Sequence, residues 1–189
     1  MVLPIVAYGD PVLKKVAKEI EKGHPGLDQV IADMFETMYA ANGVGLAAPQ
    51  VGKSIRLFVV DASPFAEDGE EGTEGLKDFK KVFINPVIKK EEGEEWAFNE
   101  GCLSIPGIRE EVFRKEKISI EYMDENFKSH KEQYDGYAAR VVQHEYDHLQ
   151  GVLFVEKISL LRRQLLKGKL ANITKGVVDV SYKMRFPKK

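Results

Sequence analysis

The chain has 189 residues, 43% hydrophobic and 31% charged, which is ordinary for one soluble globular domain with a sizeable core. No apolar run approaches the roughly 18 residues that cross a bilayer, and the N-terminal stretch lacks the features of a secretory signal, so we expect no membrane among its partners. The single cysteine, Cys102, excludes an intramolecular disulfide and fits a reducing compartment.

The net charge of −2 conceals two parts of opposite sign. Residues 157–189 carry ten basic side chains and one acidic side chain, a net charge of +9. The other 156 residues carry 18 basic and 29 acidic side chains, a net charge of −11. Such a basic end often contacts a polyanion, usually nucleic acid. The alternative is a solvated amphipathic helix and tail.

The first periodic element is a helix that starts near Pro25 and stops at Asn42-Gly43. Its apolar residues recur about one turn apart, at Leu27, Val30, Ile31, Met34, Phe35 and Met38. The next segment, "GVGLAAPQVG" (43–52), has glycines at 43 and 45. It predicts a loop whose backbone comes close to another group.

Strands are expected in the middle of the chain, at 55–61, 81–88 and 117–124, where β-branched and aromatic residues concentrate or alternate. Residues 62–79 are acidic and rich in glycine, which predicts a solvent-exposed insertion with little to bury and no chemistry. A helix is expected at 137–151 with Gly151 as its terminator, another at 159–173, and a last strand at 177–184.

The segment "QHEYDHLQG" (143–151) places His144 and His148 about 40° apart around a helix axis, so both imidazoles can reach one metal ion. Glu145 lies roughly 60° to the side of His148. From there it can contact a water molecule at the ion without being a ligand, as a general base does in metal-assisted hydrolysis. The alternative is an accidental spacing of two surface or core histidines.

A hydrolytic metal site usually holds three protein ligands and keeps a fourth position for water. In one peptidase group a third histidine extends the motif, but here Phe154 occupies that position. In another group the ligand is a glutamate on a later helix, but the last glutamate here is Glu156. We therefore expect the ligand upstream, from His24, His130 or Cys102. Of these, a lone cysteine is more often a small buried hydrophobe than a ligand.

Three segments that occur in this order bear on the choice of the third ligand: "GVGLAAPQ" (43–50), "EGCLSIPG" (100–107) and "QHEYDHLQG" (143–151). Together they closely resemble peptide deformylase, the family that removes the formyl group from the initiator methionine of nascent chains. The resemblance extends from about Ile5 to about Lys157, and the acidic insertion and extreme C-terminus look peculiar to a subgroup. It implies an α+β fold of antiparallel β-sheets around a central helix that bears the histidines.

The resemblance also implies a ligand set: Cys102, His144 and His148 would hold one divalent ion, with water in the open position. In the family the native ion is usually Fe²⁺. A thiolate with two imidazoles also suits Zn²⁺, Ni²⁺ or Co²⁺.

Three further residues receive catalytic roles from the same resemblance. Glu145 would act as the general base. The side-chain amide of Gln50 and the backbone N–H of Leu103 would both point at the formyl oxygen as it gains charge.

The resemblance assigns the lining or border of the substrate groove to Gly43, Val44, Gly45 and Arg109. An extended peptide would bind there by backbone hydrogen bonds along strand edges. Val141, one turn before His144, is expected to help form the pocket for the methionine side chain. Arg140 is expected to alter the pocket rim. Asp147 is expected to face solvent rather than orient a ligand.

We thus predict a single catalytic domain, 1–189, with an exposed acidic insertion at about 62–79 and a basic C-terminal helix and strand at about 158–189. The expected partners are N-formylmethionyl nascent peptides and, through the basic C-terminus, the ribosome. DNA is not expected, and the expected location is the bacterial cytoplasm. The rival hypotheses are a general metallopeptidase, a structural metal module with four protein ligands, and an RNA-binding protein recruited through its tail.

Overall fold

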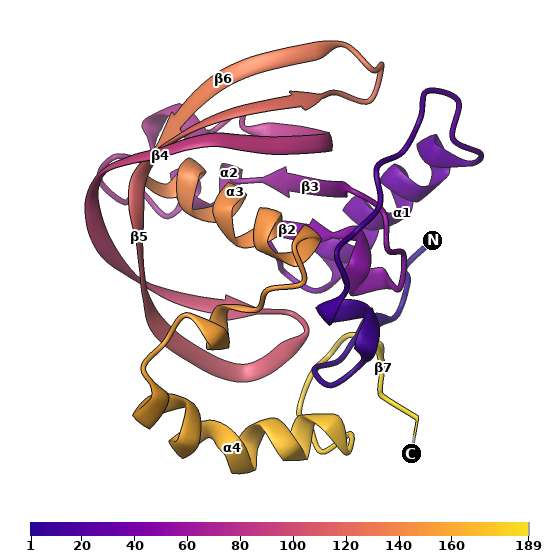
Figure 1. Cartoon of the computed structure of the whole chain (residues 1–189), viewed down its shortest axis with the longest axis vertical. Coiled ribbons are helices and arrows are strands. Elements are labelled where there is room, and N and C mark those ends of the chain that lie inside the picture. The colour runs from indigo at the N-terminus through magenta and orange to yellow at the C-terminus, as the bar shows by residue number, and fades with distance from the viewer. Residues whose placement is uncertain (189) are drawn as a thin grey trace.

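The structure is a computed structural model that describes residues 1–188 (Figure 1). Its strands are β1 (Ile5–Val6), β2 (Gly45–Ala47), β3 (Leu57–Asp61), β4 (Lys80–Cys102), β5 (Ile105–Met123), β6 (Ser129–Asp135) and β7 (Met184–Arg185). Its helices are α1 (Leu27–Ala40), α2 (Ser63–Glu67), α3 (Gly136–Leu149) and α4 (Leu160–Thr174). No helix within residues 1–188 is long and apolar enough to cross a membrane.

The predicted α+β fold is confirmed. Strands β2 to β6 form one antiparallel sheet in the order β2-β3-β4-β5-β6, and α3 lies at the centre of the molecule with β4 and β5 curving round it (Figure 1). The small sheet differs from the expectation of antiparallel pairing. Its strands β1 and β7 run parallel, with Ile5 opposite Met184 and Val6 opposite Arg185. Parallel pairing is possible because nearly the whole chain separates the two strands.

Helix α3 is the element that carries the motif histidines. It contains alanine and other good helix formers, and one of its faces is buried against the sheet, with Val142 fully covered. It ends where expected, since Gly151 adopts a φ of 71°. A β-carbon there would lie 2.5 Å from the carbonyl oxygen of Lys14, so both the turn and the close approach require glycine.

The other sequence-based boundaries were right in part. The first helix and the helix at 159–173 are confirmed as α1 and α4. Strands β4 and β5 extend far beyond the predicted 81–88 and 117–124 and form a long hairpin. The sequence missed the added residues because many of them are charged side chains that alternate with inward-facing ones. The expected loop at 43–52 is instead the edge strand β2 and a short 3₁₀ helix at Ala48–Val51.

The acidic segment 62–79 is more structured than its composition suggests. It contains α2 and a 3₁₀ turn, Glu74–Leu76. Leu76 and Phe79 are only 7% and 8% exposed and belong to the main core, so the expectation of little to bury was wrong for these side chains. Their burial pins the end of the segment to the body of the protein.

The C-terminal segment returns to the N-terminal one. Helix α4 buries Leu166, Leu170 and Ile173 but leaves Leu160 and Leu161 75% and 68% exposed. The last strand, expected at 177–184, is only the two-residue β7 at 184–185. The preceding residues cannot extend it, because β1 offers only two residues as a partner.

Candidate metal centre

Three potential ligands from two elements meet beside the sheet. Cys102 ends β4, and His144 and His148 lie one turn apart on α3. One possible ligand atom from each lies within 4.8 Å of the other two, and the Cys102 Sγ atom is 3.4 Å from His148 Nε2. A tetrahedral ion with bonds of about 2.0–2.3 Å separates its ligands by about 3.3–3.8 Å. The donor atoms and their spacing therefore fit one divalent ion. Neither His24 nor His130 joins this group.

The cysteine reaches the helix because of a tight turn. Cys102 pairs with Ile105 across the hairpin, so Leu103 and Ser104 are the two turn residues between β4 and β5. The turn lies against α3 from the side of its histidines. The contact between Cys102 and His148 joins residues far apart in sequence, which explains why the spacing of residues alone could not select the third ligand.

Glu145 is buried beside the two histidines and is only 5% exposed. Among residues 1–188, the buried side-chain atoms without a hydrogen-bond partner include Glu145 Oε2 and His148 Nδ1. Burial raises the pKa of Glu145 to about 7. An unpartnered carboxylate oxygen with a near-neutral pKa has the properties expected of a general base.

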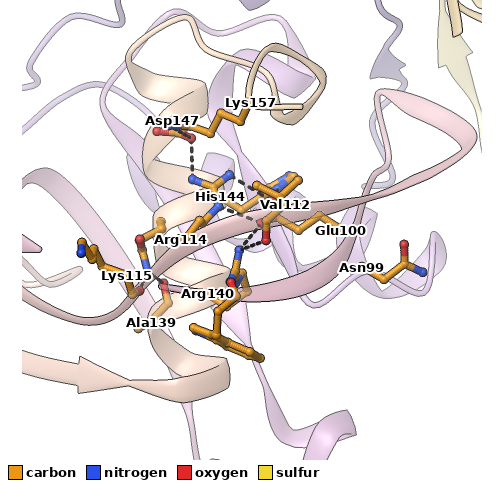
Figure 2. Close-up of polar contacts among 12 residues, drawn as sticks. Asn99, Glu100, Val112, Arg114, Lys115, Ala139, Arg140, His144, Asp147 and Lys157 are labelled. Atoms are coloured by element: carbon orange, nitrogen blue, oxygen red, sulfur yellow. Dashed lines mark hydrogen bonds and ion pairs between the residues drawn. The ribbon is translucent and has the colours of Figure 1, made fainter. Parts of the chain in front are cut away.

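Glu100 connects the site to two buried arginines (Figure 2). Its carboxylate accepts two hydrogen bonds from Arg114, at 2.7 and 3.0 Å, and one from Arg140 at 2.8 Å. Its Oε1 atom lies 2.9 Å from His144 Nδ1. Because this contact occupies Nδ1, it directs Nε2 of His144 towards the cavity. Arg114 also donates to Asp147 at 2.7 Å, so the expectation that Asp147 faces solvent was wrong.

The network sets the protonation of its members. Burial alone would raise the pKa of Glu100, but hydrogen bonds from His144 and Arg114 hold it well below its usual range. Burial opposes the charged form of His144, yet hydrogen bonds with Cys102 and Glu100 raise its pKa well above the ordinary value. For His148, burial and the nearby His144 charge lower the pKa. A neutral His148 is the form that binds a metal.

Gln50 is also held beside the cysteine, although it was expected only through the resemblance. It is 2% exposed, and its Oε1 atom accepts a hydrogen bond from the Ala47 N–H at 3.0 Å. Its Nε2 atom therefore faces the other way, 3.4 Å from Cys102 Sγ and 3.2 Å from Ser104 Oγ. The amide N–H groups are thus directed at the metal centre.

A cavity of about 550 Å³ opens over these residues. Its lining includes every substrate and oxyanion residue named from the sequence: Gly43, Val44, Gly45, Gln50, Leu103, Arg109 and Val141. Their roles remain predictions. Arg140 also lines the cavity but is 1% exposed and donates to the carbonyl of Trp96 at 2.6 Å, so it forms part of the wall rather than a free rim.

The cavity residues that the sequence argument missed include Phe65 and Tyr182. Phe65 comes from α2 in the acidic segment, and its ring packs at a tilt of 37° against that of Tyr137, with centroids 5.2 Å apart. Tyr182 comes from the C-terminal segment, and its hydroxyl donates to the carbonyl oxygen of Leu103 at 2.8 Å. Each is an isolated aromatic in a stretch with no motif, so no local signal marks it.

Comparison with known proteins adds independent support. A sequence model of the family described as polypeptide deformylase matches residues 2–164 of this chain. The chain is 60% identical to the peptide deformylase of Christiangramia forsetii, over 99% of this chain and 97% of the relative. It is 57% identical to the peptide deformylase of Flavobacterium psychrophilum, over the full length of both.

Solved structures of similar shape carry the same description. The peptide deformylase of Thermus thermophilus has a TM-score of 0.81 and 42% identity, over 93% of this chain and 99% of that chain. The enzyme of Legionella pneumophila has a TM-score of 0.79 and 39% identity, over 93% of this chain and 96% of that chain.

Proposed function

Since this chain belongs to the peptide deformylase family, we propose that Cys102, His144 and His148 hold one divalent metal ion for the reaction of that family. The reaction is hydrolysis of the N-formyl group of the N-terminal formyl-methionine of nascent polypeptides, which releases formate. The observation that carries the metal proposal is the cluster of one thiol and two imidazoles beside the unpartnered carboxylate of Glu145.

The ion and Glu145 have separate tasks. When bound, a divalent ion supplies Lewis acidity, which polarises a carbonyl group and makes water more acidic. Glu145 accepts the proton of the attacking water and passes it to the nitrogen of the departing amine. The C–N bond of the formamide breaks, and the products are formate and a free methionine N-terminus. The raised pKa of Glu145 suits a group that must both accept and donate a proton near neutral pH.

The formyl oxygen gains negative charge as water adds to the carbonyl carbon. The amide of Gln50 and the backbone N–H of Leu103 are the donors that stabilise this charge. The fixed orientation of Gln50 supports the assignment, because a donor that is already aimed need not reorganise during the reaction.

The peptide lies in the 550 Å³ cavity. Gly43, Val44 and Gly45 border it on the side of β2, Arg109 on the side of β5, and Val141 on α3. Apolar groups of Phe65, Phe98 and Val141 suit a methionine side chain, and main-chain hydrogen bonds along β2 leave the following residues unspecified.

The family resemblance favours Fe²⁺ as the native ion, with Zn²⁺, Ni²⁺ or Co²⁺ as alternatives. One thiolate and two imidazoles suit all four ions, which is why the metal content of the isolated protein decides among them.

The protein also associates with the ribosome in the bacterial cytoplasm. Arg163, Lys167, Lys169 and Lys175 are exposed along α4 and just beyond it. This basic surface complements the phosphates of ribosomal RNA.

One assay tests the proposed chemistry. Anaerobically purified protein is analysed for metal and incubated with a formyl-methionyl peptide and with the acetyl-methionyl peptide of the same sequence. We expect about one ion per chain and release of formate from the first peptide only. Glu145→Gln should retain the ion and lose turnover. Cleavage between ordinary residues would instead indicate a general metallopeptidase, and a turnover-competent Glu145→Gln variant would refute the assigned base.

A further inference from the structure

The C-terminal segment, residues 177–186, reaches the active site from a distant part of the chain. It is fastened to β1 by main-chain hydrogen bonds, from Ile5 N to Lys183 O at 2.9 Å and from Ala7 N to Arg185 O at 2.8 Å. Its side chains alternate: Tyr182, Met184 and Phe186 are half-buried, and the residues between them are exposed. The segment therefore presents one face to the body of the protein.

Tyr182 is the residue of this face that reaches the cavity. Its ring lines the cavity, and its hydroxyl donates to the carbonyl oxygen of Leu103 at 2.8 Å. Leu103 directly follows Cys102, and its own N–H is the oxyanion donor in the proposed function. The phenol thus contacts the same residue that is assigned to the reacting oxygen.

The turn that contains Leu103 lies at an irregular end of the β4–β5 hairpin, where the pairing shifts register between Gly101 and Cys102. A two-residue connection between antiparallel strands normally adopts a turn with positive φ angles, because that turn matches the twist of the strands. Neither Leu103 nor Ser104 has a positive φ, so their turn does not match the twist in this way. With the shift in register, this end of the hairpin also lacks a regular ladder, and contacts from outside the hairpin add support to the turn.

Within residues 1–188, three hydrogen bonds reach this turn from outside the hairpin. Tyr8 N–H donates to the carbonyl of Ser104 at 2.9 Å, and the Gln50 amide donates to Ser104 Oγ at 3.2 Å. Both act on Ser104. The hydroxyl of Tyr182 is the contact that acts on the backbone of Leu103 itself.

We propose that Tyr182 is a positioning residue for deformylation: its hydrogen bond to the Leu103 carbonyl fixes this turn residue and thereby aims the Leu103 N–H at the formyl oxygen. The inference rests on the oxyanion role proposed for Leu103. A positioning role for Tyr182 means that the C-terminal segment contributes to catalysis. This contribution is separate from any role of α4 in docking.

The test compares Tyr182→Phe with the wild type as full-length, metal-loaded protein. The substitution keeps the ring and removes the hydroxyl. We expect kcat to fall about 5- to 10-fold with KM and metal content unchanged, because the lost contact matters mainly when the oxygen carries charge. In Zn²⁺-loaded protein labelled with ¹⁵N-leucine, the amide resonance of Leu103 should move.

A matched control is Tyr134→Phe, which removes a hydroxyl bonded to Glu132 on β6. It should leave both kcat and the Leu103 resonance unchanged. If the wild type deformylates but Tyr182→Phe keeps its kcat and its Leu103 resonance, the positioning role is wrong while the enzyme assignment stands. A rise in KM alone would overturn the proposal in favour of direct substrate contact, and loss of metal would overturn it in favour of a structural role.

Discussion

Gly45 and Glu145 are in such close contact that a β-carbon on residue 45 would lie 2.6 Å from the Glu145 Oε1 atom and 2.8 Å from its Cγ. The edge strand and the central helix thus meet at the carboxylate that we propose as the general base. Glycine at this position leaves the space that the Glu145 side chain occupies.

Gly45→Ala should therefore displace Glu145 without touching a metal ligand. We expect the ion to be retained and kcat/KM to fall about 100-fold, the usual effect of a catalytic group misplaced by about 1 Å. The control is Gly168→Ala on α4, where a β-carbon would meet nothing within 4 Å. Steady-state kinetics and metal analysis measure the effect. Full activity in Gly45→Ala would show that activity does not depend on the observed position of the Glu145 carboxylate.

Removal of the metal should reveal the cost of burying Glu145. The pKa of Glu145 is 4.5 in the unfolded chain and about 7 in the folded protein. Between pH 4.5 and pH 7 the unfolded chain therefore binds fewer protons at this carboxyl than the folded protein does. The free energy of unfolding therefore falls as pH rises through that window. In chelator-treated protein at pH 8, Glu145→Gln should be more stable than the wild type by about 1–3 kcal/mol.

Urea unfolding at pH 4.5 and pH 8 measures this difference. The two proteins should be similar at the lower pH, where the carboxyl is largely protonated in the folded state and half protonated in the unfolded chain. Equal stabilities at pH 8 would mean that burial does not disfavour the charged form of Glu145.

Glu100→Gln should damage both stability and metal affinity. The substitution leaves Arg140 without a carboxylate partner and Arg114 with Asp147 alone, and loss of a buried ion pair costs about 3–5 kcal/mol. It also replaces the charged acceptor of His144 Nδ1 with a neutral amide, so the metal dissociation constant should rise about 10- to 100-fold.

The matched control is Glu110→Gln, which breaks an ion pair with Arg162 away from the histidines. It should leave the metal dissociation constant unchanged. Denaturant unfolding gives the free energy of unfolding, and competition with a chromophoric chelator gives the metal dissociation constant. An unchanged metal affinity in Glu100→Gln would show that Glu100 does not support metal binding.

The metal motif was predictable because its two histidines and its base are neighbours on one helix, where the spacing fixes their geometry. Cys102 could not be selected by spacing, since a β-hairpin brings it to the helix; only the ordered trio of motifs identified it. Glu100 lay within a motif, but its role depends on arginines from β5 and α3. Asp147 was expected in solvent because the sequence does not reveal Arg114 across from it.

The same limit applies to the ends of the chain. Tyr182 reaches the cavity only because β7 pairs with β1, and a two-residue strand leaves no periodic signal. Phe65 lies in a segment whose acidic composition indicates exposure.

The basic surface on α4 should govern ribosome association. Truncation is a poor test, since α4 buries leucines and β7 anchors Tyr182. Reversing three exposed charges with Lys167→Glu, Lys169→Glu and Lys175→Glu should weaken binding more than about 10-fold at low salt and flatten its salt dependence. The control reverses Lys77, Lys89 and Lys90, which lie elsewhere on the surface. Equal binding by both variants, measured by cosedimentation, would exclude this surface.

The central claim is that the sulfur of Cys102 completes a coordination sphere begun by two histidines. X-ray absorption at the metal edge of anaerobically purified protein tests it directly. We predict one sulfur at about 2.3 Å and two imidazole nitrogens at about 2.0–2.1 Å, and loss of the sulfur signal in Cys102→Ser. A wild-type spectrum with nitrogen and oxygen scatterers but no sulfur would contradict the account.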